Sequence, residues 1–476
     1  MDKYKKLAFN TMIFAIGNFG SKFLVILLTR LYTGNLSPAD SSTKELLEIT
    51  ANFLLPIFTF SMTEAVIRYG LDNKYHKGQV FTTATILNSS GLVIMLLLSP
   101  LLRLVSFLDF IDGYTILLLI YVCTSAFRSL CSQFVRAKGM VKLFSLDGIL
   151  ATLTLFIFNI IFISVLHWSV SGFMLAVILS DLCSALFLFV VAKLHTDLNI
   201  QYYNKKLATS MMRFAIPLIP TVVMWVITGF SDRLFIRYMH SDRVTLGESA
   251  AGIYGYATKV PNLISMVSTI FFQAWNMSAI MENNSKDRSQ FYEKVYRAYE
   301  ALLFISSACL IAGIQIITPL FVTTKNFGEY SSVYIYTPVL VMASLFMCLD
   351  QFLSSIYTAT KHTKNSFWTS FAASMANIVL NFFLIPEWGI QGAAIATFLS
   401  YYLCFWARII DARYYIPFRF NGINSMLNTI ALCFMCWFIV AKPVFYVLWI
   451  ILLLGFVVWS NYKSLMETAK KLLNRR

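Results

Sequence analysis

The chain has 476 residues, of which 58% are hydrophobic and only 13% charged, against roughly 25% charged residues in soluble domains. A chain this apolar cannot cover itself with a water-soluble surface, which excludes a soluble globular protein. The net charge of +15 would favour a nucleic-acid partner for a soluble protein. Basic loops between membrane helices produce the same excess, so we expect no nucleic-acid binding.

Apolar stretches follow one another from end to end, and each is close to the roughly 20 residues that a helix needs to cross a hydrocarbon core of about 30 Å. In chain order, we predict membrane helices over 7–30, 47–67, 80–102, 114–135, 143–166, 171–192, 214–238, 251–277, 298–320, 333–356, 366–385, 389–409, 422–441 and 443–460. No gap between them could hold a soluble catalytic domain. The predicted fold is all-α, a polytopic membrane protein with about 14 transmembrane helices.

The Lys and Arg residues fall mostly in every second gap. Loops rich in these residues resist translocation, so the rich side is predicted to be cytoplasmic. It includes the long gaps 193–213 and 278–297, the end of the twelfth stretch with Arg408, the N-terminal Lys3 and the basic tail 463–476. We therefore predict a multi-pass protein of the plasma membrane with both termini in the cytoplasm.

The gap 193–213 divides the chain into two sets of six helices. We predict an N-terminal six-helix lobe over 1–200, a C-terminal six-helix lobe over 201–415, and two extra transmembrane helices with the basic tail over 416–476. A short internal similarity favours parallel repeats. It relates Thr-Arg-Leu-Tyr at 29–32 to Ile-Arg-Tyr at 236–238. Such repeats suit two bundles that rock about a central cavity.

The eight Cys residues all lie in apolar stretches, where Cys is usually a small core residue rather than part of a disulfide framework. Cys433 and Cys436 have the spacing of metal ligands, but they stand alone. No phosphate-binding G-x-x-x-x-G-K-[ST] run occurs either. We expect no metal and no cofactor, and we expect the driving energy to come from an ion gradient, the membrane potential or consumption of a product.

Polar residues inside the apolar stretches mark faces that lipid cannot satisfy. In the first stretch, Asn18 lies four residues before Lys22, on one helical face. In the eighth stretch, Asn262 follows Lys259 by three residues. These faces either line a wet cavity or make hydrogen bonds between helices, and the sequence leaves both open.

Four cations, Lys22, Arg128, Arg233 and Lys259, lie inside apolar stretches. A cation at the centre of a membrane helix costs roughly 2.5–3.5 kcal/mol on insertion scales, so it is expected to have a partner or a function. An excess of buried cations over anions suits an anionic substrate such as a phosphate or diphosphate. Arg233 could instead pair with its neighbour Asp232. A drug or cation exporter would be expected to show an excess of buried carboxylates.

Two acids are candidate proton or sodium sites. Asp181 lies in the middle of the sixth stretch, and Asp232 lies in the seventh. Glu64 and Arg68, one helical turn apart in the second stretch, are either an ion pair at a helix end or a functional pair.

Three blocks of sequence carry a family resemblance: the run Phe214-Ala-Ile-Pro-Leu-Ile-Pro220 followed by Trp225, Ser231-Asp232-Arg233 and Gly252-Ile253-Tyr254; the run from Asn377 to Thr397 with Pro386, Gly389 and Gly392; and Ser61-Met-Thr-Glu64-Ala-Val-Ile-Arg68. In order and spacing they resemble the bacterial polysaccharide repeat-unit flippases (Wzx type). The first block is the most specific of the three.

The resemblance implies the multidrug, oligosaccharidyl-lipid and polysaccharide exporter superfamily, with two six-helix lobes and often two extra helices. It implies a substrate of oligosaccharide on undecaprenyl diphosphate, moved to the outer leaflet for capsule, O-antigen or other surface polysaccharide, next to the glycosyltransferases and polymerase of the pathway. The diphosphate would bind Lys22, Lys259 and Arg128 or Arg233, with Asn18 and Asn262 in the same site. The lipid II flippases of the superfamily use cavity arginines on helices one, two and eight. Here the second stretch has only Arg68, which makes a peptidoglycan precursor a less expected substrate.

Two other functions remain open. One is a cation-coupled multidrug exporter of the same fold. The other is a membrane glycosyltransferase or polymerase, which usually carries its catalytic acids in large loops. The outer loops 239–250 and 321–332 are too short for this, so we expect a transporter rather than an enzyme and assign no catalytic residue.

Overall fold

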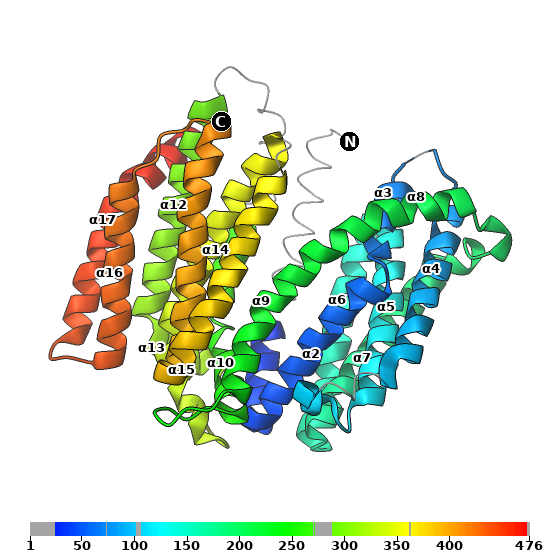
Figure 1. The fold of residues 1–476 in the computed structure, drawn as a ribbon, viewed down its shortest axis with the longest axis horizontal. Coiled ribbons are helices and arrows are strands. Elements are labelled where there is room, and N and C mark those ends of the chain that lie inside the picture. Colours follow the sequence, from blue (N-terminus) through cyan, green and yellow to red (C-terminus); the bar gives the residue numbers. More distant parts are fainter. Residues whose placement is uncertain are drawn as a thin grey trace. The chain divides into compact units, whose positions relative to one another are not determined.

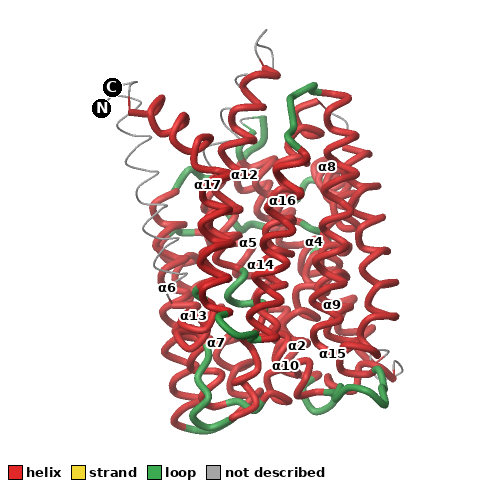
Figure 2. The backbone as a smooth tube through the Cα atoms, turned by 90° about the vertical axis from the view of Figure 1, so that its left-hand side faces the viewer, coloured by secondary structure: helices red, strands yellow, loops and turns green. Residues whose placement is uncertain are grey.

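The computed structural model describes residues 24–72, 74–100, 106–269, 271, 288–360 and 363–473. In this part of the chain the elements are helices joined by loops, without a strand, as Figure 2 shows. The described residues form two compact units, one ending at Phe230 and the other starting at Ser231. The predicted all-α class is confirmed, while the predicted domain limits stay a prediction.

The first unit begins with helical residues 24–35 and is coloured blue to green in Figure 1. Its further elements are α2 (Pro38–Phe58), α3 (Met62–Gly70), α4 (Lys77–Leu98), η2 (Ser106–Ile111), α5 (Thr115–Ala137), α6 (Val141–Asn159), η3 (Ile160–Val165), α7 (Ser169–Val191), η4 (Leu194–Thr196), η5 (Ile200–Tyr202), α8 (Lys205–Ala215) and η6 (Ile216–Leu218).

The second predicted span is a broken helix. Ser37 caps α2 by accepting a hydrogen bond from the Asp40 backbone N–H, and Pro38 fills the first helical position. The chain then bends by 54° between α2 and α3. Phe60 and Ser61 both have φ of 50° at this bend, which is costly for residues with a Cβ. Gly91 of α4 makes room for the break, because a Cβ there would collide with the Phe58 carbonyl oxygen.

The second unit contains the end of α9 (Ile219–Tyr238), which spans the boundary between the units. Its further elements are α10 (Glu248–Ala257), a helix over 262–269, α12 (Arg288–Ala312), α13 (Ile314–Phe321), η7 (Gly328–Ser332), α14 (Val333–Thr360), α15 (Thr363–Tyr415), α16 (Gly422–Ala441) and α17 (Tyr446–Leu473). Within this unit α14 packs on α15, and α17 packs on α12 and α16 (Figure 1).

The α15 element contains two predicted spans, 366–385 and 389–409, joined at a kink. Gly389 has φ of 59° and ψ of −133°, a conformation that side chains with a Cβ rarely adopt. The loop after α9 is fastened to this kink. Ser241 donates a hydrogen bond of 2.5 Å to the Pro386 carbonyl oxygen, and Arg243 forms an ion pair with Glu387.

Eight helices in the described part are long and apolar enough to cross a membrane, and the bent pair of α2 and α3 raises this to as many as nine. One of the eight, Lys364–Tyr415, is 52 residues long and holds the two spans joined at Gly389. Large apolar side chains such as Leu97, Ile116, Phe383 and Trp437 are exposed on the helices, which suits contact with lipid. The chain is a polytopic membrane protein.

Candidate functional site

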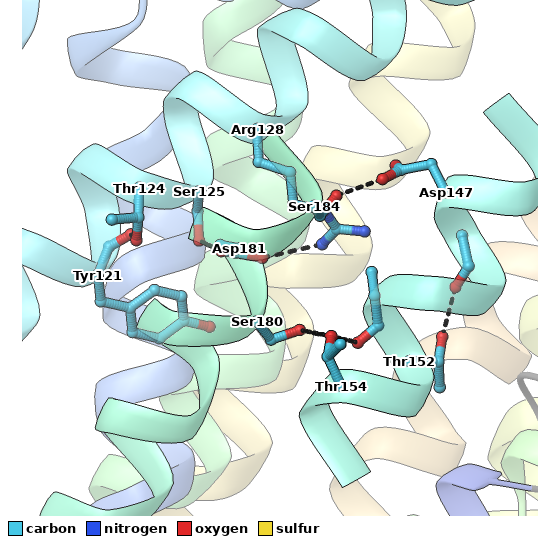
Figure 3. Close-up of polar contacts among 12 residues, drawn as sticks. Tyr121, Thr124, Ser125, Arg128, Asp147, Thr152, Thr154, Ser180, Asp181 and Ser184 are labelled. Carbon is cyan, nitrogen blue, oxygen red and sulfur yellow. Dashed lines mark hydrogen bonds and ion pairs between the residues drawn. The ribbon is translucent and has the colours of Figure 1, made fainter. Parts of the chain in front are cut away.

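An ion pair between two of the residues singled out from the sequence lies in the first unit. The Arg128 guanidinium of α5 donates from Nη1 to Asp181 Oδ1 of α7 at 3.0 Å, and Ser125 donates to the other carboxylate oxygen (Figure 3). The Asp181 side chain is 5% exposed and that of Arg128 is 32% exposed. The pair thus joins a predicted phosphate ligand to a predicted ion-coupling acid.

A second carboxylate continues this network. Arg128 Nε donates to Ser184 Oγ at 3.0 Å, and Ser184 in turn donates to Asp147 of α6 (Figure 3). Asp147 is buried, and the sequence analysis did not single it out. One guanidinium thus serves two carboxylates, Asp181 directly and Asp147 through Ser184. If both carboxylates are ionised, one further proton or cation would balance the cluster. We call Ser125, Arg128, Asp147, Asp181 and Ser184 the first polar network.

Below this network, hydrogen bonds fix α6 to α7. Ser180 Oγ donates to the Ala151 carbonyl at 2.8 Å and lies 3.0 Å from Thr154 Oγ1 (Figure 3). Such bonds between helices replace the hydrophobic effect, which does not hold helices together in lipid. The contacts of Ser180 with Ala151 and Thr154 are therefore structural.

The second unit holds a network around Asp232 of α9, which is 3% exposed. Its carboxylate accepts hydrogen bonds from Tyr254 Oη of α10 at 2.6 Å, Asn381 Nδ2 at 2.5 Å and Thr397 Oγ1 at 2.8 Å, the last two from the two parts of α15. Three donors stabilise an ionised carboxylate away from water. The sequence analysis singled out Asp232 but did not assign it these partners.

Amide and hydroxyl oxygens surround the same carboxylate. Asn377 Oδ1 accepts from Asn381 at 3.1 Å and from Ser231 at 3.3 Å. Asn381 Oδ1 is buried without a hydrogen-bond donor. Carboxylate, amide and hydroxyl oxygens are the ligands of hard cations, and an acceptor left without a donor is a place for one. We call Asp232, Tyr254, Asn377, Asn381 and Thr397 the second polar network.

Arg233 lies beside this second network. Its guanidinium carbon is 5.8 Å from the centre of the Tyr254 ring, on the ring face, so Tyr254 contacts Arg233 with its ring and Asp232 with its hydroxyl. Cation–π contacts of this kind favour Arg and leave its N–H groups able to donate. Arg233 is half-buried rather than enclosed.

Lys259 and Asn262 lie at a break in the eighth predicted span. The α10 helix ends at Ala257, residues 258–261 form turns, and helix resumes over 262–269. The expectation of one continuous helix over 251–277 is therefore wrong at this point. Pro261 gives the physical reason, because proline has no N–H to donate and clashes with the preceding turn. Lys259 is half-buried and Asn262 exposed, at the kind of helix discontinuity where transporters bind substrates and ions.

Asn18 and Lys22 lie outside the described residues, so their place in the substrate site stays a prediction. Glu64 and Arg68 are both exposed on α3, and the described residues show no ion pair between them. The described residues contain no group of three or more His, Cys, Asp and Glu side chains placed to hold a metal ion.

The balance of buried charge differs from the expectation of excess cations. The acids buried in the described part are Glu45, Asp147, Asp181, Asp232, Glu300 and Asp350, and the buried cations are Lys44, Arg237 and Arg408. Arg408 was predicted to lie on the cytoplasmic side that is rich in Lys and Arg. In the structure it is only 2% exposed, within α15. Lys44 lies with its ammonium 4.6 Å from the Tyr32 ring and 4.4 Å from the Phe173 ring. Of these acids, Glu45, Asp147, Glu300 and Asp350 were not among the site residues predicted from the sequence.

No protein-family model matches the sequence. An uncharacterised membrane protein of Methanocaldococcus jannaschii is 24% identical over 255 residues, which are 51% of this chain and 58% of that protein. The chain thus spans little more than half the length of that curated relative. Solved structures match over more of the chain, at lower identity.

A lipid II flippase MurJ in an inward closed conformation matches with a TM-score of 0.69 and 13% identity, over 97% of this chain and 100% of that one. An inward-facing MATE multidrug resistance transporter of the MOP superfamily matches with a TM-score of 0.63 and 15% identity, over 83% of this chain and 95% of that one. A mutant MATE transporter from Vibrio cholerae matches with a TM-score of 0.56 and 12% identity, over 87% of this chain and 98% of that one. The chain has the fold of MOP-superfamily transporters.

Each unit of this chain contains one of the two polar networks defined above. The first joins α5, α6 and α7, and the second joins α9, α10 and α15. Each contains a predicted ion-coupling acid, Asp181 or Asp232, beside a predicted substrate-binding arginine, Arg128 or Arg233. Predicted anion ligands and predicted cation sites are therefore neighbours in both units.

Proposed function

We propose that this protein flips oligosaccharide repeat units linked to undecaprenyl diphosphate across the bacterial plasma membrane, for capsule, O-antigen or another surface polysaccharide. The observation that carries the proposal is the likeness to a lipid flippase over 97% of this chain and all of that one. The two MATE matches leave more than a tenth of this chain uncovered. The sequence resemblance to polysaccharide flippases narrows the proposed substrate.

In the proposed mechanism the diphosphate binds cations that helices hold within the membrane. Arg128 lies in the first polar network and Arg233 lies against the Tyr254 ring, and both side chains are partly exposed. Lys259 is half-buried in the turn between α10 and the helix over 262–269, a break of the kind at which transporters bind substrates. Lys22, Asn18 and Asn262 would complete the binding of diphosphate and sugars, while the lipid tail stays in the bilayer.

Alternating access needs a source of energy. An ion gradient would supply it, and the two acids are the proposed sites for the coupling ion. Asp181 and Asp232 would bind a proton or sodium ion, because both are buried and both hold arrays of donors that a cation would rearrange. Both termini would lie in the cytoplasm, with the polymerase and glycosyltransferases of the same pathway as partners. The protein itself catalyses no covalent step.

The test uses the purified full chain in vesicles containing fluorescent undecaprenyl-diphosphate oligosaccharide. A membrane-impermeant reductant should bleach a larger share of the fluorophore when the protein and an ion gradient are present than in protein-free vesicles. Cells that lack the protein should lose surface polysaccharide and accumulate the lipid-linked units on the cytoplasmic leaflet. Unchanged bleaching in the vesicles and normal surface polysaccharide in the cells would together contradict the proposed function.

A cation-coupled multidrug exporter is the second candidate, and the excess of buried acids in the described residues favours it. The MATE likeness supports the same candidate. Vesicles with an ion gradient and ethidium in place of the labelled lipid separate the two functions. Transport of ethidium without bleaching of the labelled lipid would support the exporter function and contradict the flippase function.

A further inference from the structure

Asp350 of α14 has a buried carboxyl group that neither polar network uses. The residue is 3% exposed, and both of its carboxylate oxygens are buried without a hydrogen-bond donor. An ionised carboxylate in such a place loses its hydration, and only the nearby Arg408 charge and a weak contact from the Cys404 thiol offset the loss. A protonated carboxyl carries no charge and avoids this cost.

The nearest cation, Arg408, donates its hydrogen bonds elsewhere. Its Nη1 donates to the backbone carbonyl of Asp350 at 2.9 Å rather than to the carboxylate. Its Nη2 donates to the Ser366 carbonyl at 3.2 Å and to Ser370 Oγ at 2.7 Å, and its Nε donates to Thr369 Oγ1 at 3.0 Å. Arg408 therefore ties the backbone of α14 to the first part of α15.

The other titratable groups around Asp350 are neutral in their ordinary form. Cys404 and Tyr401 approach from α15, Tyr296 approaches from α12, and Cys348 lies on α14 itself. The Cys404 thiol is at best a weak donor. The acid Glu300 interacts with Tyr296, which also interacts with Asp350. A negative charge on Asp350 would therefore have Arg408 as its single cationic neighbour among the described residues.

We propose that Asp350 is a proton-binding site, and that the proton decides whether Arg408 binds the first part of α15 or the Asp350 carboxylate. With the proton bound, Arg408 keeps the contacts to Ser366 and Ser370 described above. When the proton leaves, the carboxylate attracts the guanidinium, because a charge-assisted bond is stronger than a bond to a neutral oxygen. Arg408 then releases Ser366 and Ser370 in the first part of α15. The proton is the ligand, and no covalent bond other than O–H forms or breaks.

The inference deepens the proposed transport function and rests on it only for the use of the proton in transport. Binding and release of the proton at Asp350 would make and break the link that Arg408 forms between α14 and the start of α15. Proton binding itself can be measured without any transport substrate, so the two proposals can fail separately.

Infrared spectra of the purified full chain test the proton directly. Wild type minus Asp350→Asn should show a protonated-carboxyl stretching band at neutral pH that shifts in heavy water. Asp411→Asn is the matched control, because Asp411 lies on α15 and accepts hydrogen bonds of 3.1 and 3.0 Å from Asn365. That variant should leave the band unchanged. Identical carboxyl bands in wild type and Asp350→Asn would overturn the proposal.

Hydrogen–deuterium exchange tests the movement of Arg408. At high pH, backbone amides over 363–371 should exchange about tenfold faster in wild type than in Asp350→Asn, measured at the same pH, since loss of a hydrogen bond to a charged group is worth roughly this factor. At neutral pH the two should agree. Equal exchange at both pH values would overturn the switch. A variant that does not fold would overturn the proton site, because asparagine has the shape of the protonated acid.

Discussion

Arg128 and Asp181 form an ion pair of 3.0 Å between α5 and α7, so the predicted ligand of the substrate phosphate is already bound to a predicted ion-coupling acid. A diphosphate that approaches Arg128 competes with Asp181 for the same N–H groups. The freed carboxylate would then gain affinity for a proton or sodium ion. Substrate and ion binding would be coupled through one guanidinium, without a long pathway between distant sites.

The first prediction separates this coupling from simple stabilisation. Arg128→Gln leaves Asp181 buried without its cation, and we expect a lower midpoint of thermal unfolding in detergent. The loss should be below the roughly 3–5 kcal/mol of a fully buried pair, because Arg128 is 32% exposed. Arg128→Gln with Asp181→Asn should restore the midpoint but not transport. Recovery of transport in the double variant would show that the pair is only structural.

The second prediction concerns the bonds to Asp232. Asp232→Asn should abolish the dependence of transport on the coupling ion, because the carboxylate is lost. Tyr254→Phe removes one donor and keeps the ring beneath Arg233, so we expect transport to fall by about tenfold or less. Tyr402→Phe is the control, since Tyr402 packs its ring 5.0 Å from that of Phe346 in the same unit. Vesicle transport with proton or sodium gradients provides the measurement.

The order of the helices could be predicted from the sequence because membrane thickness fixes the length of each apolar stretch. The predicted span 80–102 and the observed Lys77–Leu98 differ only at their ends. The breaks were harder. Gly389 and Pro261 belong to residue types that break helices. Phe60 and Ser61 at the first bend belong to neither type, and the nearest proline is Pro56 inside α2. That bend depends on how α4 packs against it at Gly91.

The site residues could be predicted as candidates because charge inside an apolar stretch is rare. Their partners could not, since Arg128 and Asp181 are 53 residues apart and meet only through the rotation and packing of two helices. Asp147 and Arg408 were missed because they lie near the ends of predicted spans, where a charge usually reaches the headgroup region. The structure shows instead that both are buried.

The third prediction concerns membrane orientation. In a background without the eight native Cys, Ser331→Cys should react with an impermeant thiol reagent added outside intact cells, because 321–332 is predicted to be an outer loop. Gln201→Cys lies in the predicted cytoplasmic gap and should react only after the membrane is opened. Both residues are exposed, so access to the thiol is not limited by the fold. Labelling of Gln201→Cys in intact cells would contradict the predicted side.

The fourth prediction asks what Lys259 contributes at the break between α10 and the helix over 262–269. If it binds a diphosphate as a point charge, Lys259→Arg should keep part of the transport and Lys259→Gln should keep little, because the amide is polar but uncharged. Lys22→Arg and Lys22→Gln should have the same effects on transport as the corresponding changes at Lys259. Lipid-linked oligosaccharide should accumulate on the cytoplasmic leaflet of the Gln variants, since synthesis precedes transport.

Lys325→Gln is the matched control, because Lys325 is exposed in the loop after α13. It should leave surface polysaccharide unchanged, which shows that loss of one positive charge is not harmful in itself. Protein in the membrane is compared by immunoblot, so that a poorly folded variant is not mistaken for an inactive one. If Lys259→Gln and Lys259→Arg support equal surface polysaccharide at matched protein levels, then Lys259 bonds a neighbouring helix and the charge-based mechanism is wrong.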